Sequence, residues 1–581
     1  MKSKYTDEKN ILILLACLKG QGIKKIVASP GATNVTFVRS AQADPFFEIY
    51  SSVDERSAAY IACGLAEESG EAVVISCTGA TASRNYMPGL TEAYYRKLPI
   101  LSVTSTQDVS RVGHNIAQVI DRSVMPKDVV RHSVHIPTIK DDDDWWNVEV
   151  NINRAILELT RHGGGPVHIN MTTTYSRYYG VESLPNIRVI SRITQSSDFP
   201  PLPEGKIAIY VGSHAKMSEA LTKAIDVFCC SNDAVVFCDH TSGYYGKYRV
   251  LHALSSSQRL ASTKELSHDL TIHIGEITGD GSVARIVGKN VWRVCEDGEL
   301  RDTYRKLKCV FEMPELAFFE YYQKKGAVGN DDFLKLCQTH LGTLRESIPE
   351  LPFSNLWVAG KSHSMLPSGS VIHFGILNSL RSWNFFELPK TVTSNCNVGG
   401  FGIDGCVSSL IGASLVDREK IYFGVVGDLA FFYDMNSIGN RHVSNNIRLI
   451  IINNGKGTEF RNFNNHASEY GDSADEFLAA GGHYGNKSKT LVKDYGSNLG
   501  FEYLTASNKL EFEENYERFF NNELTASPMI FEIFTDSEEE SEALERIMSF
   551  NKSSLGTTKQ TVINVLGAKN VKSIKKLMKK K

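Results

Sequence analysis

The chain has 581 residues, of which 42% are hydrophobic and 22% are charged, and this composition excludes a disordered or fibrous protein. Its length suits about three or four globular domains. No apolar run reaches the roughly 18 residues of a membrane span, and the start MKSKYTDEKN lacks the apolar stretch of a secretory signal. We therefore expect a cytoplasmic protein that neither spans a membrane nor is exported.

Eleven cysteines are scattered along the chain without a Cys-x-x-Cys pair, and their number is odd. Zinc-binding motifs need closely spaced cysteines, and disulfide frameworks usually contain an even number of them. The sequence therefore predicts reduced thiols, most of them buried in the interior of the protein.

The net charge of −3 is the sum of an acidic body and a basic end of the chain. Residues 552–581 contain nine lysines and no acidic residue, which leaves the rest of the chain at about −12. An acidic body argues against nucleic-acid binding, because phosphate contacts require clustered Lys and Arg. The basic tail, placed at 549–581, would suit an acidic partner or an anionic membrane surface. The alternative is a solvated chain end.

Helix-like segments alternate with short apolar runs in the first third of the chain, which is typical of a parallel α/β domain. The expected strands are residues 23–28, 72–77, 100–104 and 167–170. A Ser- and Pro-containing stretch at 191–203 indicates a linker. We therefore place a first domain at 1–185.

Two further α/β domains are expected after the linker, at 200–328 and 330–548. The apolar runs that define them are 206–212, 234–238 and 269–275 in the former, and 371–374, 420–426, 447–452 and 529–534 in the latter. The domain at 200–328 lacks a Gly-x-Gly-x-x-Gly run between a strand and a helix, so bound FAD is not expected. The predicted fold class is α/β, with three doubly wound parallel-sheet domains and a basic C-terminal tail.

Two expected strands in the third domain end in oxygen-bearing side chains. The strand at 421–426 runs into Gly427-Asp428-Leu429, and the strand at 447–452 runs into Asn453-Asn454-Gly455-Lys456. Open parallel sheets bind ligands at the carboxyl ends of their strands, and carboxylate, amide and carbonyl oxygens suit Mg²⁺. The pattern predicts a cradle for Mg²⁺ and a diphosphate.

This pattern resembles the signature of the thiamin diphosphate-dependent enzymes, with Leu429 where their commonest form has glycine. The resemblance implies a metal held by Asp428, Asn454 and the main-chain carbonyl of Lys456, with Gly427 and Leu429 beside the cofactor. The segment at 279–281, Gly-Asp-Gly, also matches the text of the motif, but no Asn-Asn pair follows it. We interpret that segment as a turn.

A second part of the resemblance lies in the first domain, where an expected strand ends in Val53-Asp54-Glu55-Arg56. The resemblance implies that Glu55 hydrogen-bonds N1′ of the aminopyrimidine and so promotes loss of the C2 proton of the thiazolium. The alternative is a solvated acid at a helix start, where the helix dipole favours a carboxylate. The resemblance also places beside the cofactor Ser29, Pro30, Gly31, Thr78, Gly79, Asn395 and Ile403, the last as an apolar support for the bent cofactor.

Within this superfamily, which includes decarboxylases and acetohydroxyacid (acetolactate) synthases, the motifs look most like those of the menaquinone-pathway carboligases. Those enzymes, 2-succinyl-5-enolpyruvyl-6-hydroxy-3-cyclohexene-1-carboxylate synthases, use 2-oxoglutarate and isochorismate. Two substrate-binding arginines of that family are missing, because the corresponding segments read Ala32-Thr33-Asn34 and Cys396-Asn397. A bidentate arginine contact contributes about 1.5–3 kcal/mol, so this substrate pair is not expected.

We therefore predict a divergent thiamin diphosphate- and Mg²⁺-dependent decarboxylase or carboligase, with pyruvate as the simplest donor and a carbonyl compound as acceptor. Such an enzyme would suit the biosynthesis of a specialised metabolite or a sugar. The side chains expected to line the substrate side are His114, Gln118, Asn395, Asn397, Glu459 and Phe460. Together with Glu55, the predicted catalytic residues are Gln118 and Glu459. An acid at 459 would select against anionic substrates or transfer a proton.

The resemblance further implies an active site assembled from two subunits, and therefore a homodimer or homotetramer. Two alternatives to the main prediction stay open. One is a true menaquinone-pathway carboligase that uses 2-oxoglutarate with rearranged arginines. The other is a cofactor-binding scaffold without catalytic activity.

Overall fold

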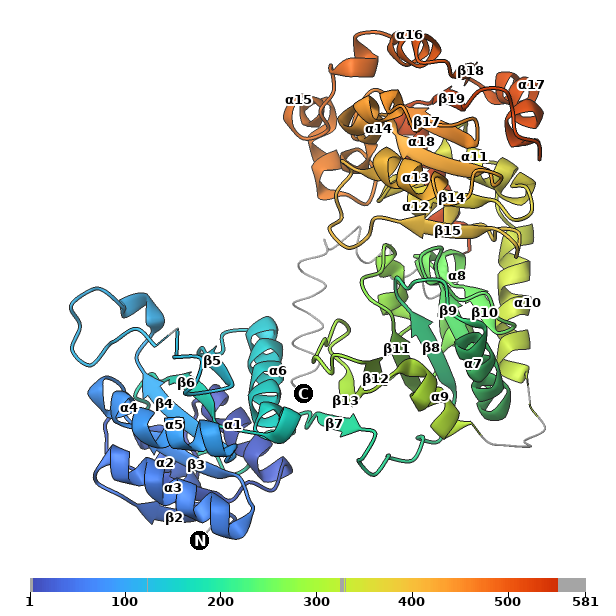
Figure 1. Cartoon of the computed structure of the whole chain (residues 1–581). Coiled ribbons are helices and arrows are strands. Elements are labelled where there is room, and N and C mark those ends of the chain that lie inside the picture. The colour runs from blue at the N-terminus through green and yellow to red at the C-terminus, as the bar shows by residue number, and fades with distance from the viewer. Residues whose placement is uncertain (1–3, 123, 324–328, 330, 552–581) are drawn as a thin grey trace. The chain divides into compact units, whose positions relative to one another are not determined.

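The computed structural model describes residues 4–122, 124–323, 329 and 331–551, so the lysine-rich segment from 552 onward lies outside the described residues. The chain forms two compact units (Figure 1). The first unit comprises the chain up to residue 199 together with 297–312, and the second comprises 200–296 and the chain from 313 onward. The domain boundaries expected at 185, 200, 328 and 548 stay predictions.

The first unit is built on a six-stranded parallel sheet with helices on both faces (Figure 1). The strand order is β2-β1-β3-β4-β6-β5, with the bounds β1 Lys25–Ala28, β2 Glu48–Ser51, β3 Val73–Cys77, β4 Ile100–Thr106, β5 His132–Ile136 and β6 Val167–Thr172. β3, β4 and β6 are buried along their whole length, which explains their apolar sequences.

Two hydrophobic clusters, one on each face of this sheet, form the core of the first unit. One cluster contains residues of α1 (Lys9–Gly20), α2 (Val35–Gln42) and α6 (Asp142–Glu158). The other contains residues of α3 (Glu55–Ser69), α4 (Thr81–Asn85) and α5 (Met87–Arg96). Outside this sheet, β7 (Ser191–Thr194) pairs in parallel with β13 (Leu307–Glu312).

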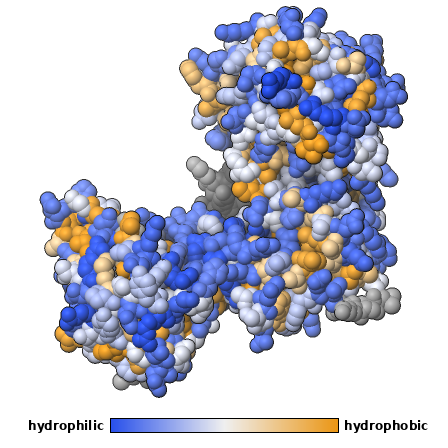
Figure 2. Space-filling view, in the orientation of Figure 1, coloured by the Kyte–Doolittle hydropathy of each residue, from blue (hydrophilic) through white to orange (hydrophobic). Residues whose placement is uncertain are grey.

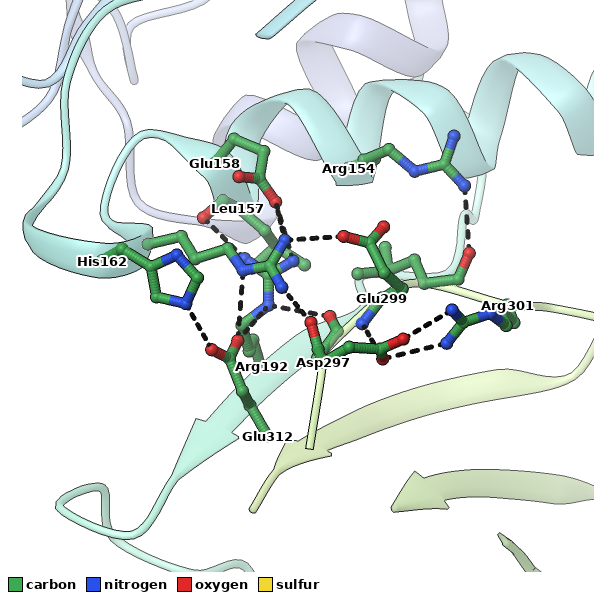
Figure 3. Close-up of polar contacts among 12 residues, drawn as sticks. Arg154, Leu157, Glu158, His162, Arg192, Asp297, Glu299, Arg301 and Glu312 are labelled. Carbon is green, nitrogen blue, oxygen red and sulfur yellow. Dashed lines mark hydrogen bonds and ion pairs between the residues drawn. The ribbon is translucent and has the colours of Figure 1, made fainter. Parts of the chain in front are cut away.

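Residues 297–312 belong to the first unit, to which arginine–carboxylate contacts attach them (Figure 3). Arg161 Nη1 donates to Glu299 Oε1 at 2.9 Å, and Arg161 Nε lies 3.2 Å from Glu312 Oε2. Arg192 Nε lies 3.4 Å from the same oxygen of Glu312. Both arginine side chains are at most 10% exposed, so solvent screens these pairs less than it screens surface pairs.

The second unit contains two further groups of parallel strands, so that three parallel sheets confirm the predicted fold class. The strands of one run in the order β10-β9-β8-β11-β12, with the bounds β8 Ile207–Val211, β9 Val235–Cys238, β10 Arg249–Leu251, β11 Leu270–Ile274 and β12 Asn290–Cys295. The other has the order β15-β14-β16-β17-β19-β18, with the bounds β14 Val371–Phe374, β15 Thr393–Cys396, β16 Tyr422–Gly427, β17 Ile447–Asn453, β18 Glu502–Ala506 and β19 Met529–Phe534.

The helices of the second unit connect and cover these strands (Figure 1). They are α7 Glu219–Asn232, α8 Ala253–Ser257, α9 Glu315–Tyr322, α10 Asp332–Glu346, α11 Asn355–Ser362, α12 Asn378–Trp383, α13 Cys406–Ser414, α14 Asp428–Asp434, α15 Ala474–Phe477, α16 Leu491–Asn498, α17 Lys509–Phe520 and α18 Ser537–Ser549. The four strands expected in this part of the sheet are present as β14, β16, β17 and β19, whereas the edge strands β15 and β18 were not expected. Both edge strands are only partly buried and carry polar residues, so their sequences lack the apolar run of a central strand.

On the face shown in Figure 2, hydrophilic residues predominate and hydrophobic residues gather in separate small patches. No helix in the described part of the chain is long and apolar enough to cross a membrane. All eleven cysteines are free thiols and most are buried, which confirms the prediction from their spacing.

Candidate active site

Asp428 joins the ends of two neighbouring strands in the second unit. It begins α14 directly after β16, and its buried carboxylate accepts hydrogen bonds from Leu429 N at 2.9 Å and from Gly455 N at 2.7 Å. Burial raises the pKa of Asp428 to about 7, and the negative charge of the neighbouring Glu532 adds to this rise. A cation at this position would therefore offset the cost of ionising Asp428.

Asn454 follows β17, the strand that pairs with β16. Its Oδ1 is buried and has no hydrogen-bond partner among the described residues. Gly455 then turns the chain with φ +75°, and a Cβ at this position would lie only 1.6 Å from Asn486 Oδ1. The turn therefore requires glycine, and it leaves a buried amide oxygen available to a ligand.

The side chain of Lys456 forms an ion pair, whereas its main-chain carbonyl is the group predicted to bind the metal. Lys456 Nζ lies 2.6 Å from Asp475 Oδ2, and the Lys456 carbonyl accepts a hydrogen bond from Thr458 N at 3.0 Å. A carbonyl oxygen has two lone pairs, so one remains for a metal. In the described part of the chain, no cluster of three or more His, Cys, Asp or Glu side chains is arranged for a metal. A cation here would depend on mixed carboxylate, amide and carbonyl oxygens, which suits Mg²⁺.

These residues line one cavity of about 130 Å³. Most of the predicted second-unit site residues share it, and they are Ile403, Gly427, Asp428, Leu429, Asn454, Lys456, Glu459 and Phe460. Asn395 is not among the lining residues and is exposed on the edge strand β15.

Glu459 forms an ion pair with Arg381, a residue that was not among those predicted from the sequence. Arg381 on α12 donates to both carboxylate oxygens of Glu459, at 2.7 and 3.3 Å. Asn378, one turn earlier on α12, accepts a hydrogen bond from Arg381 at 3.0 Å. This pairing largely neutralises the charge of Glu459, so the acid alone does not set the electrostatic preference of the cavity.

Glu540 on α18 is a further acid of this cavity that the sequence pattern did not indicate. Its Oε1 accepts hydrogen bonds from Asn355 N at 2.9 Å and from Thr535 Oγ1 at 2.7 Å. Burial raises the pKa of Glu540 to about 7, and the nearby Asp428 adds to this effect. The folded protein therefore binds a proton at Glu540 more tightly than the unfolded chain does.

The raised pKa of Glu540 predicts a pH-dependent contribution to stability. The contribution is complete below about pH 4.5, the ordinary pKa of Glu, and is lost as the pH rises through about 7. We expect the thermal midpoint of the metal-free protein to fall between about pH 5 and 8, and Glu540→Gln to reduce that fall. The largest effect on the unfolding free energy is about 3.5 kcal/mol, because the pKa rises from 4.5 to about 7 and each pKa unit corresponds to about 1.4 kcal/mol.

Differential scanning fluorimetry across this pH range would measure the effect of Glu540→Gln. Glu542→Gln is the control, because Glu542 lies on the same helix but is exposed and paired with Arg546. An unchanged slope in Glu540→Gln would show that another group dominates the pH dependence.

Glu55 begins α3 in the first unit, directly after the capping residue Asp54. The Asp54 side chain accepts a hydrogen bond from Ser57 N at 2.7 Å, which fixes the start of the helix. Glu55 is partly exposed, and its Oε2 accepts a hydrogen bond from Asn85 Nδ2 at 3.2 Å. The local geometry therefore keeps the Glu55 carboxylate accessible.

The other predicted residues of the first unit gather at the carboxyl ends of β1 and β3. A Cβ at Gly31 would lie 2.4 Å from Thr78 Cβ, so only glycine permits this approach. A Cβ at Gly79 would lie 3.2 Å from the main-chain oxygen of Gln118, which places these two segments side by side. Ser29 is buried, whereas Pro30 and the Gln118 side chain are exposed.

Arg122 is a buried cation beside Gly79 that the sequence analysis missed. Its Nη1 donates to Ser83 Oγ at 3.2 Å and its Nη2 donates to Asn170 Oδ1 at 2.8 Å. Burial lowers the pKa of Arg122 to about 10, and both of these acceptors are neutral. A single buried arginine gives no periodic signal in the sequence, so the pattern did not reveal it.

The Gly-Asp-Gly segment at 279–281 caps a short helix, which confirms its interpretation as a turn. The Asp280 side chain accepts a hydrogen bond from Ser282 N at 2.9 Å, and residues 281–285 form one 3₁₀ segment. Thr278 Oγ1 accepts a hydrogen bond from Asp280 N at 3.0 Å.

Comparison with known proteins finds similar enzymes and one matching family model. The family model for the N-terminal TPP binding domain of thiamine pyrophosphate enzymes matches residues 12–125. The chain is 29% identical over 557 residues to 2-succinyl-5-enolpyruvyl-6-hydroxy-3-cyclohexene-1-carboxylate synthase of Bacteroides fragilis, covering 93% of this chain and 98% of that protein. The enzyme of the same name from Bacteroides thetaiotaomicron is 28% identical over 567 residues, with the same coverage.

Among solved structures, the chain is similar to a thiamine diphosphate-dependent 4-hydroxybenzoylformate decarboxylase of Rhodococcus jostii RHA1. The identity is 14%, the TM-score is 0.39, and the match covers 91% of this chain and 99% of that one.

Proposed function

Because the chain belongs to the thiamin diphosphate-dependent enzymes, we propose that it removes carbon dioxide from a 2-oxo acid and transfers the remaining acyl group to an acceptor. The observation that carries this proposal is the buried Asp428 carboxylate, which shares a cavity with the unsatisfied amide oxygen of Asn454. This pair suits Mg²⁺ bound to a diphosphate. Thiamin diphosphate, when bound, supplies the electron sink for decarboxylation.

Separate residues of the chain would bind the cation, support the cofactor and hold a proton. Asp428, Asn454 and the Lys456 carbonyl would hold the cation, and Ile403 would support the cofactor from the wall of the same cavity. Glu55 would hold a proton against the aminopyrimidine nitrogen.

We propose that the active enzyme is a homodimer or a homotetramer. The resemblance implies that Glu55 of one subunit serves the diphosphate site of another. Val53, Tyr60 and Ile61, close to Glu55 in the chain, are 79%, 47% and 44% exposed. Large apolar side chains exposed beside a predicted catalytic acid support a subunit contact there.

Two different observations each favour a different donor substrate. The similarity to the two synthases over almost their whole length favours the menaquinone-pathway reaction, with 2-oxoglutarate as donor. The segments Ala32-Thr33-Asn34 and Cys396-Asn397, which lack arginine, favour a less anionic donor such as pyruvate. We therefore place 2-oxoglutarate with isochorismate first and pyruvate second.

The test is release of carbon dioxide by the purified protein loaded with thiamin diphosphate and Mg²⁺. The donors are 2-oxoglutarate, pyruvate and 2-oxobutyrate, each with and without isochorismate or an aldehyde acceptor. We expect release from one donor and a faster rate when its acceptor is present. Tight cofactor binding without release from any donor would favour the inactive scaffold instead.

The Glu459–Arg381 pair predicts how donor preference can be shifted. Glu459→Gln removes the acid but leaves the Arg381 guanidinium, so the cavity becomes more favourable to a dianionic donor. We expect kcat/KM for 2-oxoglutarate to rise relative to pyruvate by about fivefold, corresponding to the ~1 kcal/mol of a partly exposed ion pair. Steady-state kinetics with both donors would measure the ratio. Glu469→Gln, at an exposed site nearby in the chain, is the control, and an unchanged ratio in Glu459→Gln would contradict the prediction.

A further inference from the structure

A second cavity, of about 340 Å³, lies in the second unit and shares no lining residue with the predicted cofactor cavity. Its walls come from β10, from α10 and from the segment that leads into β15. β10 and β15 are edge strands of their respective sheets. The volume falls within the roughly 300–1,000 Å³ of small-molecule sites.

Part of the lining of this second cavity is apolar. Leu251, Leu341, Leu388 and Val392 contribute to its lining, and each is at most 8% exposed. Tyr245 also lines the cavity, and its hydroxyl accepts a hydrogen bond from Ser394 N at 3.1 Å. The wall is therefore suited to an aryl or alkyl group, and the tyrosine is fixed against β15.

The charged residues of the lining carry an excess of positive charge. Glu387 is the acidic side chain among the lining residues, and its carboxylate lies 2.9 Å from Arg249 Nε and 3.6 Å from Arg345 Nη2. Arg249 is further engaged, because its Nη1 donates to the Tyr244 carbonyl at 2.9 Å. The Arg249–Glu387 pair is thus internally balanced, and Arg345, at the longer distance from the carboxylate, adds a positive charge to the lining.

Two lysines also line the cavity. Lys247 is paired with Asp331 at 2.6 Å, whereas Lys390 is exposed and forms no ion pair with any described residue. Once the balanced pairs are set aside, Arg345 and Lys390 leave about two positive charges beside an apolar wall. This combination favours a ligand that is apolar at one end and anionic at the other.

We propose that this cavity is a binding site for a small amphipathic carboxylate, with its aryl or alkyl body against the leucines and its carboxylate at Arg345 and Lys390. A neutral ligand of the same shape would leave Lys390 without an ion-pair partner and Arg345 with only its longer contact to Glu387. A cationic ligand would be repelled by them. The site is independent of the donor and acceptor proposed above, because none of its lining residues contributes to the predicted cofactor cavity.

The experiment uses the full chain loaded with thiamin diphosphate and Mg²⁺, with 4-biphenylcarboxylate as probe and 4-biphenylmethanol as its neutral counterpart. Isothermal titration calorimetry should show binding of the carboxylate and at least about tenfold weaker binding of the alcohol. The double variant Arg345→Ala with Lys390→Ala should weaken carboxylate binding by at least about tenfold and leave the alcohol unchanged. Lys335→Ala, on the same helix but outside the cavity lining, should change neither.

A space-filling variant tests the location separately. Gly342 lines the cavity, and a Cβ added there would meet no atom within 4 Å, so a side chain can begin at this position and Gly342→Trp is the variant chosen to fill the space. It should abolish binding of both probes, whereas Gly342→Ala should retain it. Equal affinity for carboxylate and alcohol, unchanged binding in the double variant or in Gly342→Trp, or no binding of either probe would overturn the proposal.

Discussion

Replacing Glu55 by Gln is expected to lower kcat by about 10²–10⁴-fold, the usual contribution of a positioned acid or base. Glutamine preserves the size of the side chain and one acceptor oxygen, so the hydrogen bond from Asn85 Nδ2 can persist. It cannot exchange a proton, which is the role proposed for the carboxyl group. Cofactor affinity should therefore stay nearly unchanged while turnover is lost.

Two measurements on Glu55→Gln separate catalysis from folding. Titration with thiamin diphosphate and Mg²⁺ reports cofactor binding, and single-turnover release of carbon dioxide reports the chemical step. Glu68→Gln, at the exposed end of the same helix α3, is the matched control and should behave like the unmodified protein. Full activity in Glu55→Gln would remove Glu55 from the mechanism, and loss of cofactor binding would assign it a structural role.

Asp428→Asn is expected to produce two effects of opposite sign. Loss of groups that merely orient a metal ligand already weakens metal binding about 10–100-fold, so loss of a charged ligand should weaken Mg²⁺-dependent cofactor binding by at least about 100-fold. The metal-free protein, however, should become more stable near and above pH 7. The substitution removes a buried carboxylate whose pKa is raised to about 7 and which is costly to ionise.

The test of Asp428→Asn therefore combines cofactor titration with thermal unfolding at about pH 6 and 8. Asp417→Asn is the control, because Asp417 precedes the same strand but lies on the surface beside Lys420. The two effects should separate clearly: weaker cofactor binding together with a higher thermal midpoint of the metal-free protein at the higher pH. A lower midpoint combined with unchanged cofactor affinity would contradict both the metal role and the cost of burial.

Sequence pattern was sufficient for the features that depend on local order along the chain. Asp428 and Asn454 follow strands whose apolar runs are complete in the sequence, so their place at one edge of a parallel sheet could be predicted. The cavity that contains both agrees with this prediction. Glu55 follows the same logic, since an acid after a strand and a capping Asp54 mark a helix start.

Contacts between distant segments could not be predicted in the same way. Glu459 and Arg381 are 78 residues apart, and Glu540 is 185 residues from the main-chain amide of Asn355 that it binds. Neither separation along the chain corresponds to a helix or strand periodicity, so the sequence pattern does not indicate these pairs. Because these partners decide the charge of Glu459 and the proton affinity of Glu540, the electrostatics of the cavity emerged only with the structure.

The return of residues 297–312 to the first unit has a consequence for synthesis on the ribosome. N-terminal domains generally fold first as they emerge, yet this unit lacks part of its structure until residue 312 has been made. Until then Arg161 and Arg192 have no Glu312, and β7 has no β13 to pair with. More than half of the chain must therefore be translated before the first unit can complete its fold, and β7 lacks its partner strand in the interval.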